Sequence, residues 1–175
     1  MFHVAALTVA LVAISAAPTS ERTITFDDVA YTRQFVGNMN PGGLAEYVRA
    51  GETVDNWTTL VAVRNFPKLD DPGKAAAQLV KTLKASNPLA RFQLLVKEDE
   101  SEAMVDFITW PKDGGYAEFN VFRYLKRKGY AGLIAYQFAY RFTDTGPDAS
   151  ERVKQDRQRW VEAMSRADFP IDFAK

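Results

Sequence analysis

Apolar and polar residues alternate along several stretches of the chain, a pattern that predicts half-buried β-strands. The clearest is 132–142, where every second residue is apolar or aromatic: Ile134, Tyr136, Phe138, Tyr140 and Phe142. Together with turn residues at the breaks, the pattern predicts six strands, at 44–49, 57–66, 91–97, 103–110, 117–126 and 132–142. The first two form an expected hairpin, and the short loops between the last four predict an antiparallel meander.

Two other stretches repeat their apolar residues at helical spacing. We expect the first helix at 72–86, because Asp71 suits the N-cap and Pro72 suits the first helical position. Its apolar stripe is Ala76, Leu79, Val80 and Leu83, and the Asn87-Pro88 pair ends it. The second helix is expected from the turn at 146–148 to about Arg166. Its buried face is Val153, Trp160, Val161 and Met164.

The first 17 residues, MFHVAALTVALVAISAA, are an apolar run ending in small residues, which is typical of a secretory signal peptide. We expect cleavage after Ala17. Because no Lys or Arg precedes the run, an uncleaved membrane anchor and a buried N-terminal helix stay open as alternatives. The chain then divides into a signal peptide at 1–17, an N-terminal extension and loop at 18–43, and a single domain at 44–175. One or two weak strands are expected between residues 24 and 36.

These elements predict an α+β fold, with an antiparallel β-sheet of about six strands packed with two amphipathic helices. Their order is β-β-α-β-β-β-β-α after the signal peptide, and the helices could cover one face of the sheet or both. From Leu44 to Arg166 this order resembles the PsbP-like α/β/α sandwich. The stretch from Tyr47 to Val63, which contains GETVDNWTTLV, is similar to uncharacterised exported bacterial proteins. The PsbP-like resemblance implies a binding or accessory role and assigns no functional residue.

The composition limits the chemistry that the protein can perform. The 175 residues include no cysteine and one histidine, His3, which leaves with the expected signal peptide. Without imidazole or thiol, a mature domain cannot use a Ser-His-Asp triad, a cysteine nucleophile or the usual zinc ligands. Basic and acidic residues number 22 each, so the chain lacks the positive charge typical of nucleic-acid binding. We expect no cofactor, no metal site and no nucleic-acid partner.

The most distinctive local group is Glu52, Asn56 and Trp57, at the turn before the second predicted strand. A tryptophan beside polar turn residues could anchor a partner or ligand, since aromatic residues dominate binding interfaces. The alternative is structural: Trp57 closes the end of the core while Glu52 and Asn56 cap the turn. These three residues are our candidate binding site, and we assign no catalytic residue.

Several polar residues in the middle of predicted strands could also form a functional groove. Asp106 could be a buried acid or could point to solvent. Arg123, Gln137 and Arg141 could share its face, but a slip of one residue in a turn would move them to the other face. The acidic stretch 98–102 is expected to be a solvated hairpin turn, because it lacks the spacing of a calcium-binding loop.

We expect an exported, non-catalytic binding or accessory protein that recognises a protein partner or a small ligand, in the periplasm or outside the cell. No stable membrane anchor should remain after signal cleavage. Two alternatives stay open. One is a hydrolase that uses carboxylates or lysine, and the other is a hydrophobic-ligand carrier that uses the aromatic-rich face. A pocket lined by apolar side chains would favour the carrier.

Overall fold

The computed structural model describes residues 22–39, 41–110, 115–143 and 147–173, and in them it confirms an α+β fold with one antiparallel sheet and two helices. The strands are β1 (Thr23–Phe26), β2 (Val29–Asn38), β3 (Gly43–Val48), β4 (Thr59–Phe66), β5 (Arg91–Val96), β6 (Glu102–Thr109), β7 (Ala117–Lys126) and β8 (Leu133–Phe142). The helices are α1 (Pro72–Ser86) and α2 (Pro147–Arg166). Neither helix of this described part has the length and apolar run needed to span a membrane.

The prediction of about six strands is wrong, because the described residues contain eight. The two additional strands, β1 and β2, come from the stretch in which we expected one or two weak strands. Asp27 and Asp28 form the turn between them, with φ angles of 50° and 61° in the left-handed region. Aspartate tolerates this region better than most residues, so Asp-Asp closes a hairpin that more often uses Asn-Gly. The expected signal peptide and its cleavage site after Ala17 lie outside the described residues.

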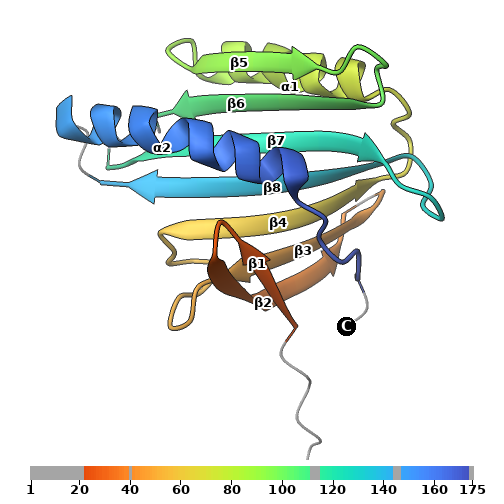
Figure 1. The fold of residues 1–175 in the computed structure, drawn as a ribbon, viewed down its shortest axis with the longest axis horizontal. Helices are drawn as coiled ribbons and strands as arrows, with labels where there is room; N and C mark the ends of the chain where they lie inside the picture. The colour runs from red at the N-terminus through yellow and green to blue at the C-terminus, as the bar shows by residue number, and fades with distance from the viewer. Residues whose placement is uncertain (1–21, 40, 111–114, 144–146, 174–175) are drawn as a thin grey trace, which may run out of the picture.

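The strands form one sheet in the order β1-β2-β3-β4-β8-β7-β6-β5 (Figure 1). β1 to β4 are joined as consecutive antiparallel neighbours, and so are β5 to β8. Because α1 follows β4 and leads to the far edge strand β5, the second meander returns across the sheet and sets β8 against β4. This closing pair brings together side chains about 70 residues apart in sequence, such as Arg64 and Ala135.

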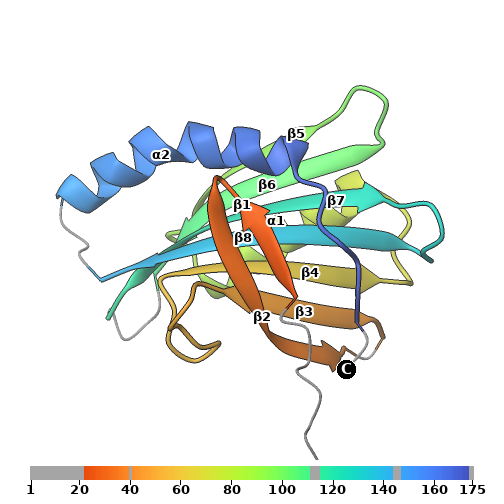
Figure 2. The same ribbon diagram turned by 60° about the horizontal axis from the view of Figure 1, so that its bottom comes forward.

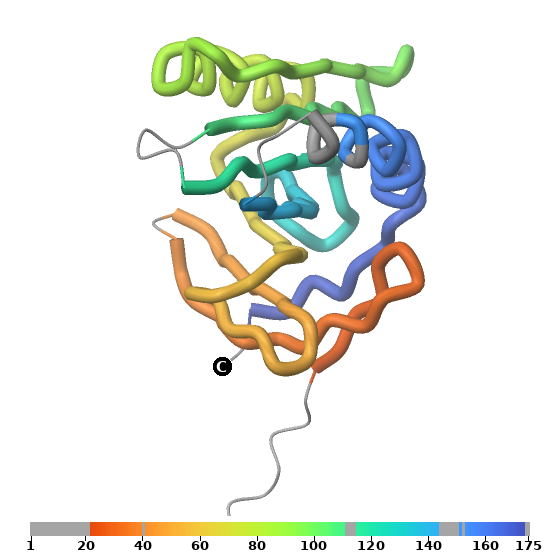
Figure 3. The backbone as a smooth tube through the Cα atoms, turned by 90° about the vertical axis from the view of Figure 1, so that its left-hand side faces the viewer, coloured from red at the N-terminus to blue at the C-terminus, as the bar shows by residue number. Residues whose placement is uncertain are grey.

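The two helices lie on opposite faces of the sheet, which settles the choice that the sequence left open. Figure 3 shows α1 in yellow-green on one side and α2 in blue on the other. α1 packs over β5, β6 and β7, whereas α2 packs over β7 and β8. The β1–β2 end of the sheet curls toward α2 (Figure 2). We call the two surfaces the α1 face and the α2 face.

The larger part of the hydrophobic core lies on the α2 face. Trp160 of α2 packs its ring 5.2 Å from that of Phe138 and 5.3 Å from that of Phe119. Val153 and Met164, from the same helix, are also buried. The alternating aromatic positions of β8 therefore face a helix, which fills the space above them.

Candidate ligand-binding pocket

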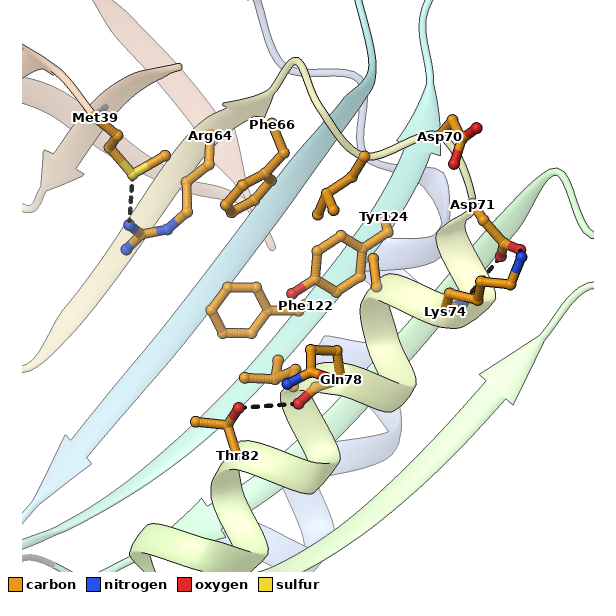
Figure 4. A pocket seen from close by; sticks show the side chains of 13 residues that line it. Met39, Arg64, Phe66, Asp70, Asp71, Lys74, Gln78, Thr82, Phe122 and Tyr124 are labelled. Carbon is orange, nitrogen blue, oxygen red and sulfur yellow. Dashed lines mark hydrogen bonds and ion pairs between the residues drawn. The ribbon is translucent and has the colours of Figure 1, made fainter. Parts of the chain in front are cut away.

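A pocket of about 590 Å³ opens on the α1 face, beside α1 (Figure 4). Its floor is aromatic and comes from Phe66 of β4 and from Phe122 and Tyr124 of β7, while α1 forms one wall. The lining residues are Met39, Arg64, Phe66, Leu69, Asp70, Asp71, Lys74, Ala75, Gln78, Leu79, Thr82, Phe122 and Tyr124.

The strand register places Arg64 and Tyr124 on the same face of the sheet. Ala135 of β8 pairs with Arg64 of β4 on one side and with Tyr124 of β7 on the other. The three side chains share the α1 face, because residues directly opposite one another in antiparallel strands point the same way. Neighbouring strands lie about 4.8 Å apart, so the backbones of Arg64 and Tyr124 are separated by about 10 Å. Ala135 itself is fully buried and does not line the pocket, because side chains of the surrounding core cover it.

Arg64 gives the pocket a guanidinium group that neighbouring side chains hold in one orientation. Its Nε and Nη2 atoms donate to Oε1 of Gln137 at 3.1 and 2.8 Å, and Nε2 of Gln137 donates to Oδ1 of Asn120 at 2.9 Å. Among the described residues, Glu46 is the one carboxylate that pairs with Arg64, 3.8 Å from Nη2. Nη1 faces the sulfur of Met39 at 3.8 Å. Burial lowers the pKa of Arg64 more than Glu46 raises it, so its charge is incompletely compensated.

Tyr124 adds a second polar group to the aromatic floor. Its ring centroid lies 6.1 Å from that of Phe122 and 6.2 Å from that of Phe66. Burial raises the pKa of Tyr124 to about 12, although the positive charge of Arg64 acts in the opposite direction. The phenol therefore stays protonated at neutral pH. No described residue hydrogen-bonds its hydroxyl group, which is directed into the pocket (Figure 4).

The end of the pocket near the start of α1 is polar and open to solvent. Asp71, the N-cap of α1, accepts a hydrogen bond from the backbone N–H of Lys74 at 2.9 Å, and this bond lowers the pKa of the Asp71 carboxyl. Its other carboxylate oxygen lies 3.1 Å from Nζ of Lys74. Gln78 and Thr82 line the α1 side and are exposed. The pocket thus combines a charged mouth, an aromatic floor and one half-buried cation.

This arrangement suits binding better than catalysis. The carboxylates in the lining are Asp70, which is exposed at the mouth, and Asp71, which caps the helix. Within the described part of the chain, no group of three or more His, Cys, Asp or Glu side chains could hold a metal ion. A protonated phenol and a guanidinium group can donate hydrogen bonds, so they favour a ligand that carries acceptors.

A smaller cavity of about 280 Å³ lies between α2 and the β1–β2 hairpin, and it contains the carboxylates Asp27 and Asp156. Both are ion-paired with Arg159, at 3.1 and 3.0 Å. Tyr31 donates a hydrogen bond to Thr59 at 3.2 Å in the same cavity. Its polar groups are therefore largely occupied by one another, unlike those of the pocket on the α1 face.

The predicted binding group lies away from this pocket. Glu52 accepts hydrogen bonds from the backbone N–H and the hydroxyl of Thr58, so one of its oxygens supports the turn. Asn56 is exposed and closes the turn through its backbone, while Trp57 is half-buried with its ring 4.0 Å from the guanidinium carbon of Arg141. These contacts suit the structural alternative, and the binding role of the three residues stays a prediction.

The mid-strand polar residues do not form one groove, because they divide between the two faces. Asp106 is buried on the α2 face and pairs with Arg157 of α2 at 2.6 Å. Arg123 shares this face, since it is opposite Met104 in the register. Gln137 lies opposite Phe122 and so points to the α1 face. Asp106 and Arg123 therefore attach α2 to the sheet, whereas Gln137 serves the pocket.

Sequence reasoning missed Arg64 and Tyr124 as site residues. A signal for Arg64 was present, because it is the one charged residue in the predicted strand WTTLVAVRNF. A charge in an otherwise apolar strand requires either solvent or a partner. Tyr124 carried no comparable signal, since aromatic residues are common in strands.

A protein-family model matches residues 17–169 of the chain. No curated protein and no solved structure matches it.

Proposed function

We infer the function from the pocket, because the chain belongs to an uncharacterised family, whose model covers residues 17–169 and which implies no activity. The protein binds a small ligand with an apolar body in the pocket on the α1 face. The binding is non-catalytic. The ligand body lies on Phe66, Phe122 and Tyr124, against α1.

The observation that carries this proposal is a preformed pocket of about 590 Å³ with an aromatic floor. Pockets that hold small ligands usually measure roughly 300–1,000 Å³ and combine apolar walls with a few polar groups that orient the ligand. Here the polar groups are Arg64 and Tyr124, and both have donor capacity that neighbouring side chains leave free. An aromatic surface left open in water is costly, and a ligand that covers it recovers that free energy.

This proposal joins two of the expectations from the sequence, small-ligand recognition and a hydrophobic-ligand carrier. The carboxylates of the smaller cavity, Asp27 and Asp156, are both engaged by Arg159, which speaks against a hydrolase that uses them. The likeness to the PsbP-like group stays a prediction, and the proposal does not depend on it.

We further propose that binding takes place after export, in the periplasm or outside the cell. The apolar run at 1–17 with its small residues before Ala17 supports this localisation. The mass of the protein recovered from the periplasm or the medium is the test. A chain that begins at or just after Pro18 is expected, and one that retains Met1 contradicts the proposal.

The ligand-binding proposal is tested with N-phenyl-1-naphthylamine, a neutral apolar dye whose fluorescence rises out of water. We expect saturable binding to the protein, because the uncharged aromatic rings of the dye can pack against the aromatic floor of the pocket. In the variant Gln78→Trp an indole at the rim fills the pocket and should weaken binding about tenfold or more, the cost of losing apolar contact over one ring system.

The matched control is Ala77→Trp, which adds the same side chain one position along α1, at an exposed residue that does not line the pocket. Binding to this variant should equal that of the unchanged protein. Dye binding that is absent, that does not saturate, or that is weakened equally by both substitutions would refute the assignment of the pocket.

A further inference from the structure

We propose that the ligand is a monocarboxylate with an apolar chain, and that its carboxylate is bound by Nη1 of Arg64 with the Tyr124 hydroxyl as a second donor. This inference rests on the proposed function, because it assigns the polar end of the ligand whose apolar body occupies the pocket. The apolar chain then extends over Phe66 and Phe122 toward α1.

The first step concerns the direction of the free donor. Gln137 accepts from Nε and Nη2 of Arg64 with one oxygen, and Asn120 in turn holds the amide of Gln137. The guanidinium is planar, so fixing these two nitrogens also fixes Nη1. The contact of Nη1 is the sulfur of Met39 at 3.8 Å, and sulfur is a weak acceptor. A carboxylate oxygen is a far stronger acceptor for this position.

The second step concerns charge. The Arg64 side chain is 21% exposed, and Glu46 approaches Nη2 only to 3.8 Å, beyond normal hydrogen-bond length. The other cation of the lining, Lys74, lies at the mouth and is paired with Asp71 at 3.1 Å. Arg64 is thus the one partly compensated cation beside the aromatic floor, and it selects a ligand with one negative charge. A cationic ligand would be repelled, a neutral alcohol would gain only a neutral hydrogen bond, and a dianion would leave one charge without a partner.

The third step concerns the second donor. The Tyr124 hydroxyl is directed into the pocket and has no hydrogen-bond partner among the described residues. Because burial keeps the phenol protonated at neutral pH, the hydroxyl can donate a hydrogen bond to a carboxylate. Arg64 and Tyr124 pair with Ala135 from either side and both line the pocket, so a ligand in the pocket meets a donor from each of the two strands. Two donors from two strands therefore set the position of the carboxylate, in addition to the selection for one negative charge.

The experiment compares decanoate, 1-decanol and decylamine, which share one chain and differ at the polar end, as competitors of bound N-phenyl-1-naphthylamine. We expect decanoate to displace the dye at a concentration about tenfold or more below that of decanol, because a hydrogen bond to a charged group is worth more than a neutral one. Decylamine should be the weakest. Decyl phosphate, which carries roughly 1.5 to 2 negative charges at neutral pH, should compete less well than decanoate.

The variant Arg64→Gln removes the cation, and the ratio between decanol and decanoate should fall to about one. Arg64→Lys keeps the charge and should retain a smaller preference for decanoate. The matched control is Arg141→Gln, which removes an arginine paired with Glu118 on the same face but outside the pocket lining, and it should keep the full ratio.

The unchanged protein provides a test that needs no substitution. Below about pH 4 decanoate becomes a neutral acid, so its advantage over decanol should disappear while circular dichroism shows that the protein stays folded. The carboxylate assignment is overturned if decanol competes as well as decanoate at neutral pH, or if Arg64→Gln keeps the ratio. Failure of the dye itself to bind would overturn the proposed function instead, so the two failures are distinguishable.

Discussion

Replacing Arg123 with methionine removes the contacts that attach the end of α2 to the sheet. The Arg123 Nε atom donates to Oε2 of Glu102 at 2.7 Å. Its Nη1 atom donates to the carbonyl oxygens of Ala167 at 2.8 Å and of Met164 at 3.2 Å. The Arg123 side chain is 9% exposed, so these bonds lie largely out of water. Methionine keeps most of the apolar stem and removes the donors.

The expected loss follows from these partners. The hydrogen bond to the Glu102 carboxylate contributes roughly 1.5–3 kcal/mol, and the carbonyl of Ala167 left without its donor costs about 1 kcal/mol more. Glu102 keeps Lys97 at 2.8 Å, so no charge is left unpaired. We therefore expect Arg123→Met to lower the free energy of unfolding by about 3 kcal/mol, a large part of the roughly 5–15 kcal/mol typical of a domain.

Urea unfolding followed by tryptophan fluorescence measures this loss, because Trp160 of α2 is buried against the sheet. The control is Arg127→Met. It removes an exposed ion pair with Asp168, which lies in the C-terminal segment after α2, next to Ala167. This substitution should lower the free energy of unfolding by less than about 1 kcal/mol. If Arg123→Met lowers the free energy of unfolding by less than about 1 kcal/mol, or by no more than Arg127→Met, the buried hydrogen bonds of Arg123 do not stabilise the protein as we reason.

Two further predictions concern acid stability and backbone conformation. Burial raises the pKa of Glu102, but hydrogen bonds from Arg123 and Lys97 outweigh it and hold the pKa below the ordinary 4.5. The stability that this carboxylate contributes is complete above that ordinary value and is lost as pH falls through the lower folded-state value. Glu102→Gln should therefore make the acid-side decline in unfolding free energy shallower, and an unchanged slope would contradict this. Gly132 has φ +71°, and a Cβ there would lie 2.2 Å from the carbonyl oxygen of Phe66, whereas Gly51 has φ +82° and open space around it. Gly51→Ala should cost about 1 kcal/mol, Gly132→Ala at least twice as much, and equal losses in urea unfolding would refute the clash.

Much of the fold follows from local sequence patterns. The helix Pro72–Ser86 has the predicted bounds, because its Asp-Pro start and Asn-Pro end act within a few residues. The strands β3 to β8 also lie within a few residues of their predicted places. The count was short by two because the turn between β1 and β2 uses Asp27 and Asp28 in left-handed conformation. Two adjacent aspartates in an apolar stretch indicate a loop, unless a tight hairpin turn with both residues in the left-handed region is considered.

The candidate site was much less accessible to sequence reasoning. Glu52, Asn56 and Trp57 drew attention because they are close in sequence, and the structure places them at a turn outside the pocket. Arg64 and Tyr124 are 60 positions apart. They become neighbours across Ala135 only through the pairing of β4 with β8 and of β8 with β7.

The sequence by itself determined the kind of most elements and which side chains of one element share a face, because the periods of 3.6 and two residues are local properties of the backbone. It also determined that Arg64 must be accommodated within an apolar strand. Only the tertiary structure decided which strands are neighbours, and in what register. That pairing is set by the packing of the whole sheet with two helices on opposite faces, and it is what brings a guanidinium and a phenol from distant parts of the sequence into the lining of one pocket.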